Sequence, residues 1–407
     1  MSGTELRRLG GELVSAQDDK IIRVVAMLDK LPHRGAADAL LVPLRPRLAR
    51  LRPVRPLTFE RLLFTPLDSL ILQPADWKRD APGIPRSALR PLADTVRQNQ
   101  PQLASQIDAR LAGQRADATA TVIAVGDLLW PEAAKCLASA PMPANWTVAS
   151  GLREQDYAAL APVIAAMLGC AISLNVLQQI HLAGLPVPLD RLEPLVSAVA
   201  RAGPLALTTL LAILTEIIPD QPSLRSLTER LAGTDIDPRL RMAAEQAMDF
   251  VVDRLETTAP LPRDLVEAER DVSRLAVLFD DLESRSRERP SRLARLRRAR
   301  ERADAECRAA FGEALSEQVL LPAGGLASAD DATVIHLEGA AHSLRRMEQA
   351  ARRIGGAAHY DRALQACAEQ LAPQNGDGRE TRMDRARLVE ILLGSEAAQS
   401  WLATLAG

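Results

Sequence analysis

Five arginines fall within one short, proline-containing run, and their side chains could bind a charged ligand. The run is RPRLARLRPVR, which contains no acid and supplies Arg45, Arg47, Arg50, Arg52 and Arg55. Guanidinium groups form paired hydrogen bonds with phosphate and carboxylate groups. These five residues are therefore our candidates for a contact with phosphate, with an acidic partner or with anionic lipid.

The same arginines have a second interpretation, in which they form ion pairs with acidic faces elsewhere in the fold while Leu48, Leu51 and Val54 pack. We favour this structural interpretation. A contact with DNA would position the protein without reading bases, because the sequence shows no recognition helix. Binding of single strands also uses stacking aromatic side chains, and none is interleaved in the run.

A second basic run spans residues 285–308 and contains ten arginines and four acids. Alone it resembles a nucleic-acid-binding arm. The segment before it, residues 264–283, is acidic, with seven Asp or Glu residues against two arginines. Opposite charges beside an apolar seam favour the pairing of two helices. We therefore interpret the second basic run as one half of a helical hairpin.

His336, Glu338 and His342 lie close together in the sequence and are the candidates for metal chemistry. Spacings of two and six residues do not place them on one helical face, as the HExxH motif does. No cysteine is near enough to complete a tetrahedral site. We expect neither a metal nor another cofactor.

Motifs of nucleophilic and phosphate chemistry are missing from the sequence, which has no GxSxG, no GxxxxGK[ST] and no GxGxxG after a strand. Carboxylate pairs such as Asp280-Asp281 and Asp330-Asp331 lie in polar segments. Nothing in the sequence indicates the burial that would shift their pKa values toward those of an acid–base catalyst. We therefore expect no enzymatic activity. An enzyme whose active site is assembled without such motifs in the helical stack stays as an alternative.

The composition favours helices. Only 3% of the residues are aromatic, so the core must be built mainly from Leu, Ala, Val and Ile, and Leu and Ala are strong helix formers. The 407 residues are enough for two or three domains. With a net charge of −2, the protein has no overall electrostatic field that would attract nucleic acid or anionic lipid. The excess of arginine over lysine is typical of a GC-rich, bacterial-like composition.

Cysteine usage and hydropathy predict a cytoplasmic protein. The four cysteines are far apart and form no CxxC pair, which is typical of free, buried thiols in the cytosol. No apolar run near the start is long enough for a signal peptide. The segment 157–189 has no formal charge and approaches the ~20 apolar residues that a membrane span needs. Because it contains Pro162, Gly169 and Asn175, we interpret it as a helix buried in protein.

We predict an all-α fold with four regions. Residues 1–100 form a proline-rich segment of short helices and turns, and residues 101–260 form an irregular stack of antiparallel helices, HEAT- or armadillo-like at most weakly. Residues 261–322 form the hairpin, and residues 323–407 form a small C-terminal helical domain. Glycines should end the helices of the stack; they are Gly113, Gly151, Gly184, Gly203 and Gly233.

The hairpin has the clearest periodic signal. Apolar residues spaced three and four apart form a seam along its first helix, 263–285: Leu265, Ala268, Val272, Leu275, Phe279 and Leu282. The second helix, 291–320, follows a turn at Ser286–Pro290 and carries a weaker seam with Arg300 at one core position. Its apolar members are Leu293, Leu296, Ala303, Cys307, Ala310 and Ala314.

Further helices are expected at 331–353, 357–371, 382–394 and 396–405. Two strand-like runs, Thr121–Val125 and Thr333–Leu337, are interpreted as helical, because two isolated strand signals cannot build a sheet. Asp117 and Asp331 precede these two runs, where Asp can cap the start of a helix.

These features predict a non-enzymatic scaffold or adaptor, a protein–protein interaction subunit of a larger assembly. The alternative is a nucleic-acid-associated protein that binds phosphates through residues 45–55. A protein partner is expected, nucleic acid is a less favoured partner, and membrane insertion is not expected. The identity of the partner, the process served and the oligomeric state stay open.

Overall fold

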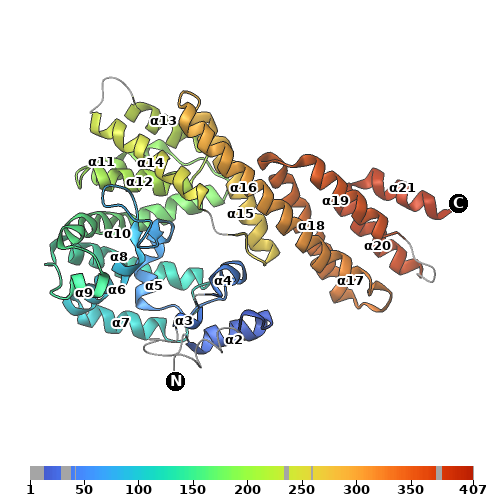
Figure 1. The fold of residues 1–407 in the computed structure, drawn as a ribbon, viewed down its shortest axis with the longest axis horizontal. Coiled ribbons are helices and arrows are strands. Elements are labelled where there is room, and N and C mark those ends of the chain that lie inside the picture. Colours follow the sequence, from blue (N-terminus) through green and yellow to red (C-terminus); the bar gives the residue numbers. More distant parts are fainter. Residues whose placement is uncertain are drawn as a thin grey trace. The chain divides into compact units, whose positions relative to one another are not determined.

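The fold is all-α, as predicted, and is shown by a computed structural model whose helices make up 79% of the structure (Figure 1). The model describes residues 13–28, 38–41, 43–232, 238–257, 260–372 and 378–406. Within this described part only two short strands occur, β1 (Ile71–Leu72) and β2 (Ile84–Pro85), which pair in parallel.

The chain forms two compact units. Unit 1 comprises residues 1–24, 33–53 and 256–407, and unit 2 comprises residues 25–32 and 54–255. The helix α2 (Asp18–Leu28) begins in unit 1 and ends in unit 2. Unit 1 is thus discontinuous in the sequence, because the long segment of unit 2 is inserted after Pro53.

Unit 2 is a stack of helices separated by Gly and Pro breaks. Gly113, Gly151, Gly184 and Gly203 have positive φ angles between helices, as predicted, whereas Gly233 lies outside the described residues. Its helices are α5 (Phe59–Phe64), the 3-10 helix η2 (Thr65–Leu70), α6 (Arg86–Asn99), α7 (Pro101–Leu111), α8 (Thr119–Ser139), α9 (Trp146–Ser150), α10 (Glu154–Leu182), α11 (Leu189–Ala200), α12 (Pro204–Ile217), α13 (Pro222–Ala232) and α14 (Pro238–Glu256).

The uncharged segment predicted to be buried in protein lies mainly in α10, which packs against α8 and α12. By length and composition, α10 is the one described helix that could cross a membrane. Of its most apolar window, 56% is buried inside unit 2, and the core helix of a soluble protein passes the same test. Leu160, Ile164, Met167 and Leu168 are among its buried side chains.

Both strand-like runs are helical, within α8 and within α18 (Asp331–Ile354). Their predicted caps were wrong. Asp117 makes no side-chain cap for α8, which begins after Ala118. At α18 the cap is Asp330, whose carboxylate accepts a hydrogen bond of 2.9 Å from the Thr333 amide. The helix starts one residue earlier than the prediction required, so Asp331 is already inside its first turn.

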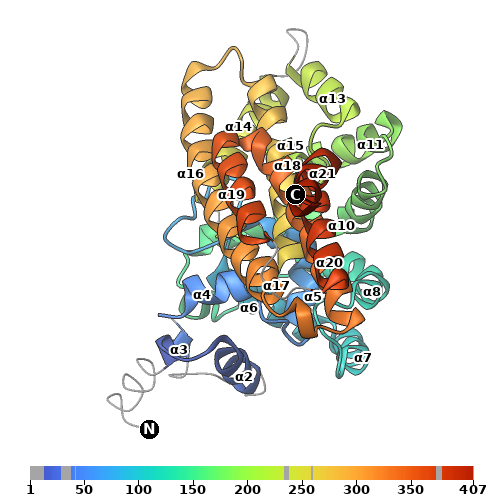
Figure 2. The ribbon, with the colours of Figure 1, turned by 90° about the vertical axis from the view of Figure 1, so that its right-hand side faces the viewer.

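Unit 1 carries the predicted C-terminal helices, each within a few residues of its expected bounds (Figure 2). The π-helical turn η3 continues α16 without a break into α17. The elements are α3 (Asp38–Leu41), α4 (Arg45–Leu51), α15 (Leu265–Arg285), α16 (Pro290–Leu315), η3 (Ser316–Leu320), α17 (Leu321–Ala323), the 3-10 helix η4 (Leu326–Ser328), α18, α19 (Ala357–Gln370), α20 (Arg379–Leu393) and α21 (Ser395–Ala406).

The helical hairpin is confirmed, and it has a third member. Residues 286–289 connect α15 to α16, and Pro290 opens α16, where its missing amide hydrogen costs nothing. All six predicted seam residues of α15 are buried. Both helices of the hairpin pack against α18, which lies alongside them (Figure 1). The apolar seam of α15 is therefore covered from two sides.

The seam predicted for α16 was only partly right. Leu296 and Cys307 are fully buried, but the three alanines at 303, 310 and 314 are half-buried. Phe311 and Leu315 are buried instead. Arg300 lies at the edge, where it pairs with Asp280 of α15 at 2.6 Å. The buried residues of α16 therefore differ from the predicted seam at the three alanines, and Phe311 packs edge-on against Tyr360 of α19 with the ring centroids 5.2 Å apart.

We expect Phe279→Ala to lower the free energy of unfolding by about 3–5 kcal/mol, because it removes a fully buried ring and leaves a cavity. Val266→Ala is the matched control on the same helix, since Val266 is 53% exposed. Urea unfolding followed by circular dichroism measures both. Equal midpoints for the two variants would contradict the described packing of α15.

Candidate functional site

The arginine-rich run forms the short helix α4, with Pro46 in its first turn. The helix ends at Arg52, whose φ of 40° is in the left-handed region. Leu48 and Leu51 are half-buried, whereas Val54, which we expected to pack, is 45% exposed. The run crosses the division between the units, because Arg55 belongs to unit 2, where its carbonyl accepts a hydrogen bond from the Ala116 amide.

Three of the five candidate arginines form ion pairs within unit 1. Arg47 donates to Asp18 at 2.6 Å, and Arg50 pairs with Glu313 of α16. Arg52 pairs with Asp271 of α15 at 2.7 Å. Arg45 is exposed and makes no ion pair within the described residues. The contact of these five residues with phosphate or with a partner stays a prediction.

Arg263 joins two of these pairs into a network. Its guanidinium group pairs with Asp18 and, at 2.7 Å, with Glu313, and its amide donates to the Arg50 carbonyl at 2.8 Å. We call Asp18, Arg47, Arg50, Arg263 and Glu313 the N-terminal clasp. The clasp connects segments of unit 1 that are far apart in sequence, since Arg50 and Glu313 are separated by 263 positions.

The electrostatics of the clasp favour the ionised carboxylate. Burial acts to raise the pKa of the Glu313 carboxyl, but the hydrogen bonds and charges of Arg263 and Arg50 outweigh it and lower the pKa below the ordinary 4.5. The neighbouring cavity holds about 20 Å³. This is room for about one water molecule.

The second basic run is also largely committed to contacts inside unit 1. Arg295 pairs at 3.1 Å with Glu256, the last residue of α14 and the first of the C-terminal segment of unit 1, and Arg300 pairs with Asp280 and Glu283 of α15. Acidic residues of α15 also form ion pairs with arginines of α18. The sequence did not predict these pairs. Arg346 pairs with Glu269 at 2.6 Å, and Arg353 pairs with Asp280 at 2.7 Å.

The histidine and cysteine residues show no assembled chemistry in the described part of the chain. His336 and His342 are exposed on α18, and no group of three potential ligands there could hold a metal ion. The four thiols are buried. Burial raises the pKa of Cys170 to about 11, and raises the pKa values of Cys307 and Cys367 to about 12. These thiols are protonated at neutral pH.

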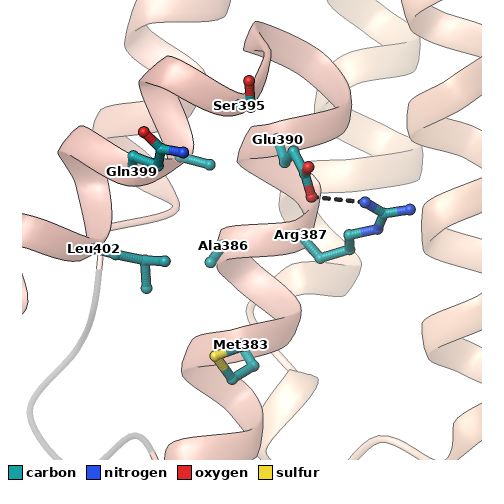
Figure 3. A pocket seen from close by; sticks show the side chains of 8 residues that line it. Met383, Ala386, Arg387, Glu390, Ser395, Gln399 and Leu402 are labelled. Carbon is teal, nitrogen blue, oxygen red and sulfur yellow. Dashed lines mark hydrogen bonds and ion pairs between the residues drawn. The ribbon is translucent and has the colours of Figure 1, made fainter.

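The more open site is a groove between α20 and α21, with a cavity of about 220 Å³ (Figure 3). Small buried side chains, Ala386 and Ala398, line it. Met383 and Leu402 flank it and are 56% and 36% exposed. The polar residues around it are Ser395, Gln399, and the ion pair of Arg387 with Glu390 at 2.6 Å.

One side of α20 next to the groove is acidic. The carboxyl of Asp384 lies near Glu338 and Asp331 of α18 and near Glu380 of its own helix. Burial and then these three carboxylates raise the pKa of Asp384 above its ordinary value. Sequence reasoning missed the groove, because its exposed apolar residues belong to two helices whose packing decides what stays uncovered.

Comparison with known proteins finds no matching family model, no matching curated protein and no matching solved structure.

We expect Glu313→Gln to lower the free energy of unfolding at pH 7 by about 1 kcal/mol, because Arg50 and Arg263 lose the negative charge with which both form ion pairs. The folded-state pKa of Glu313 lies below 4.5. Its contribution is therefore complete above pH 4.5 and is lost as the pH falls through the lower, folded-state value. Urea unfolding at neutral and at acidic pH measures the change.

Glu301→Gln is the control, because Glu301 is exposed on α16 and makes no ion pair within the described residues. If Glu313→Gln lowers the free energy of unfolding equally at both pH values, the result would contradict a contribution of the Glu313 charge to stability.

Proposed function

We propose that the protein is a non-enzymatic helical adaptor, which binds an amphipathic helix of a protein partner in the groove between α20 and α21. The observation that carries this proposal is the exposure of Met383 and Leu402 beside the small side chains Ala386 and Ala398. Bound helices insert large apolar side chains into such grooves at i, i+3, i+4 and i+7.

The size and chemistry of the groove favour a helix over a small molecule. Its cavity of about 220 Å³ is smaller than the roughly 300–1,000 Å³ of small-molecule sites. Methionine is flexible and polarisable, so Met383 can adapt to a partner's apolar side chains. The Arg387–Glu390 pair and Gln399 provide polar groups around an apolar centre, an arrangement typical of protein interfaces.

The alternatives from the sequence draw on other residues. Phosphate binding would use the arginine-rich run, where Arg47, Arg50 and Arg52 already have carboxylate partners. A salt titration with labelled nucleic acid distinguishes this alternative, because each neutralised phosphate adds about −0.9 to the log–log slope of affinity against salt. For an adaptor that binds through an apolar groove, we expect a shallow salt dependence of helix binding.

We expect Met383→Asp to raise the Kd for a helical peptide about tenfold or more, because it places a charge in the apolar part of the groove. The probe is a fluorescent synthetic peptide with leucines at i, i+3, i+4 and i+7, and fluorescence anisotropy measures its Kd with the full chain.

Met242→Asp is the matched control, since Met242 is 52% exposed on α14 of unit 2. Circular dichroism checks that both variants are folded. A peptide that does not bind the unaltered protein, or that binds both variants equally, would overturn the proposed use of the groove.

A further inference from the structure

One glutamine side chain holds the connection between α10 and α11. Within this connection Pro186 and Pro188 have no amide hydrogen, so Val187 is the only backbone donor of its last three residues. The Val187 amide donates to Oε1 of Gln221 at 2.9 Å, and the Val187 side chain is buried. Nε2 of Gln221 lies 2.9 Å from Nδ1 of His181, in the last turn of α10. Gln221, which directly precedes α13, therefore bridges the end of α10 and the connection that follows it.

The Val187 amide determines which atoms of this bridge donate. A backbone N–H can only donate, so the Gln221 atom that faces it is the carbonyl oxygen, and the NH2 group of Gln221 faces His181. That NH2 group can only donate, so Nδ1 of His181 must accept. An accepting Nδ1 carries no proton, and the ring is then neutral with its proton on Nε2. The bridge therefore requires an uncharged His181.

Protonation of His181 is incompatible with this pair of hydrogen bonds. The added proton on Nδ1 would face the hydrogens of the Gln221 NH2 group. Rotation of the Gln221 amide by 180° would present its oxygen to the imidazolium and its NH2 group to the Val187 amide, where two donors cannot bond. The rotated arrangement is favoured, because a hydrogen bond from a charged ring is stronger than the neutral bond to Val187. Protonation therefore breaks the bond that holds the connection.

The neighbouring carboxylate can stabilise a protonated His181. Burial lowers the pKa of His181 below its ordinary 6.5, and the negative charge of Asp220 acts against this shift. Asp220 has a φ of 59°, in the left-handed region that is uncommon outside glycine. Its carboxylate accepts a hydrogen bond of 2.8 Å from Arg225 of α13. The charged ring is thus disfavoured by burial and still has a carboxylate within reach of its field.

Titration near pH 6 in unit 2 belongs to His181. This residue is the one histidine of unit 2, and histidine is the side chain whose ordinary pKa lies between 5 and 8. Among the described residues, Asp220 is the one whose charge acts on the His181 pKa. Glu193 and Glu216 form ion pairs with arginines of α13 and α14. The charged residues on the elements that pack against α10 are Asp68 of η2, Asp127, Glu132 and Lys135 of α8, Asp190, Arg191 and Glu193 of α11, and Glu216 of α12.

We propose that His181 and Gln221 form a pH-sensitive latch, which holds the connection between α10 and α11 while His181 is neutral and releases it when His181 is protonated. Leu182 and Leu185 beside the latch are 64% and 56% exposed. Release therefore adds the buried Val187 to an apolar surface that is already present. The latch lies in unit 2 and is independent of the groove between α20 and α21.

NMR of the histidine side chains in the full chain tests the first requirement of the latch. At pH 7.5 we expect His181 to be neutral with its proton on Nε2, as long-range ¹H–¹⁵N correlation spectra report, and we expect its pKa to lie below 6.5. The His181→Gln protein assigns the signal. A neutral ring with its proton on Nδ1 would overturn the latch, because that nitrogen could not accept from Gln221.

Hydrogen exchange of the Val187 amide tests the release. We expect its protection factor to fall about fivefold to tenfold between pH 7.5 and pH 5, because one hydrogen bond is lost. His181→Gln should abolish this pH dependence, since glutamine does not titrate. His342→Gln is the matched control, which removes an exposed histidine of unit 1 and should leave the pH dependence unchanged. A protection factor that falls equally in the His181→Gln protein would overturn the proposal.

Gln221→Glu gives the decisive result, because it inverts the latch with almost no change of shape. A carboxylate accepts at both oxygens, so it can bond the Val187 amide and a protonated Nδ1 of His181 together. We expect the pKa of His181 to rise relative to the unaltered protein, and the Val187 amide to stay protected at pH 5. Circular dichroism checks that the variant is folded. A folded Gln221→Glu protein that leaves the His181 pKa unchanged, or that loses Val187 protection at pH 5, would contradict the latch.

Discussion

Burial of the α15 seam is the interaction on which the described part of unit 1 depends. The seam is regular because apolar residues recur three and four apart over the whole helix, and an isolated helix cannot hide such a stripe from water. α16 covers one side and α18 the other, and α18 also contacts α20. The packing of α18 on α15 therefore positions α20. The packing of α20 in turn positions the C-terminal groove.

Arginine supplies the polar contacts that hold these helices in register. Its planar group can bind two carboxylate oxygens at once, as Arg346 does with both oxygens of Glu269, which a lysine ammonium does less well. A fully buried carboxylate, Glu348, sits on α18 between Arg345 and Arg352. Removing either arginine from such a site would leave a buried charge poorly compensated. The arginine-rich composition thus has an architectural use in this unit.

The fold class and the helices could be predicted because apolar periodicity and Gly or Pro breaks are local signals. The seam of α15 was predicted residue by residue, since its spacing is regular and its residues are large. The third helix of the arrangement was not predicted, because Leu337 and Leu344 of α18 show an apolar face without naming its partner. A local sequence pattern predicts that a helix face is buried. Only the tertiary structure identifies the helix against which that face packs.

The candidate site was harder to predict for the same physical reason. The arginine-rich run was visible in the sequence, but the partner of Arg50 is Glu313, 263 residues away. Nothing in the spacing of either residue indicates that pair. The groove depends on where α21 lies against α20, so the exposure of Met383 and Leu402 cannot be read from either helix alone.

The insertion of unit 2 into unit 1 imposes an order on synthesis. Arg50 and Arg52 leave the ribosome long before the carboxylates with which they pair, because Asp271 and Glu313 follow after the whole of residues 54–255. Unit 2 has its own core and can fold while the chain is still growing. During that interval Arg50 and Arg52 are without the carboxylates of Glu313 and Asp271, with which they pair in the completed fold. Two ion pairs that join the first and last segments of unit 1 can thus form only after the whole of unit 2 has been synthesised.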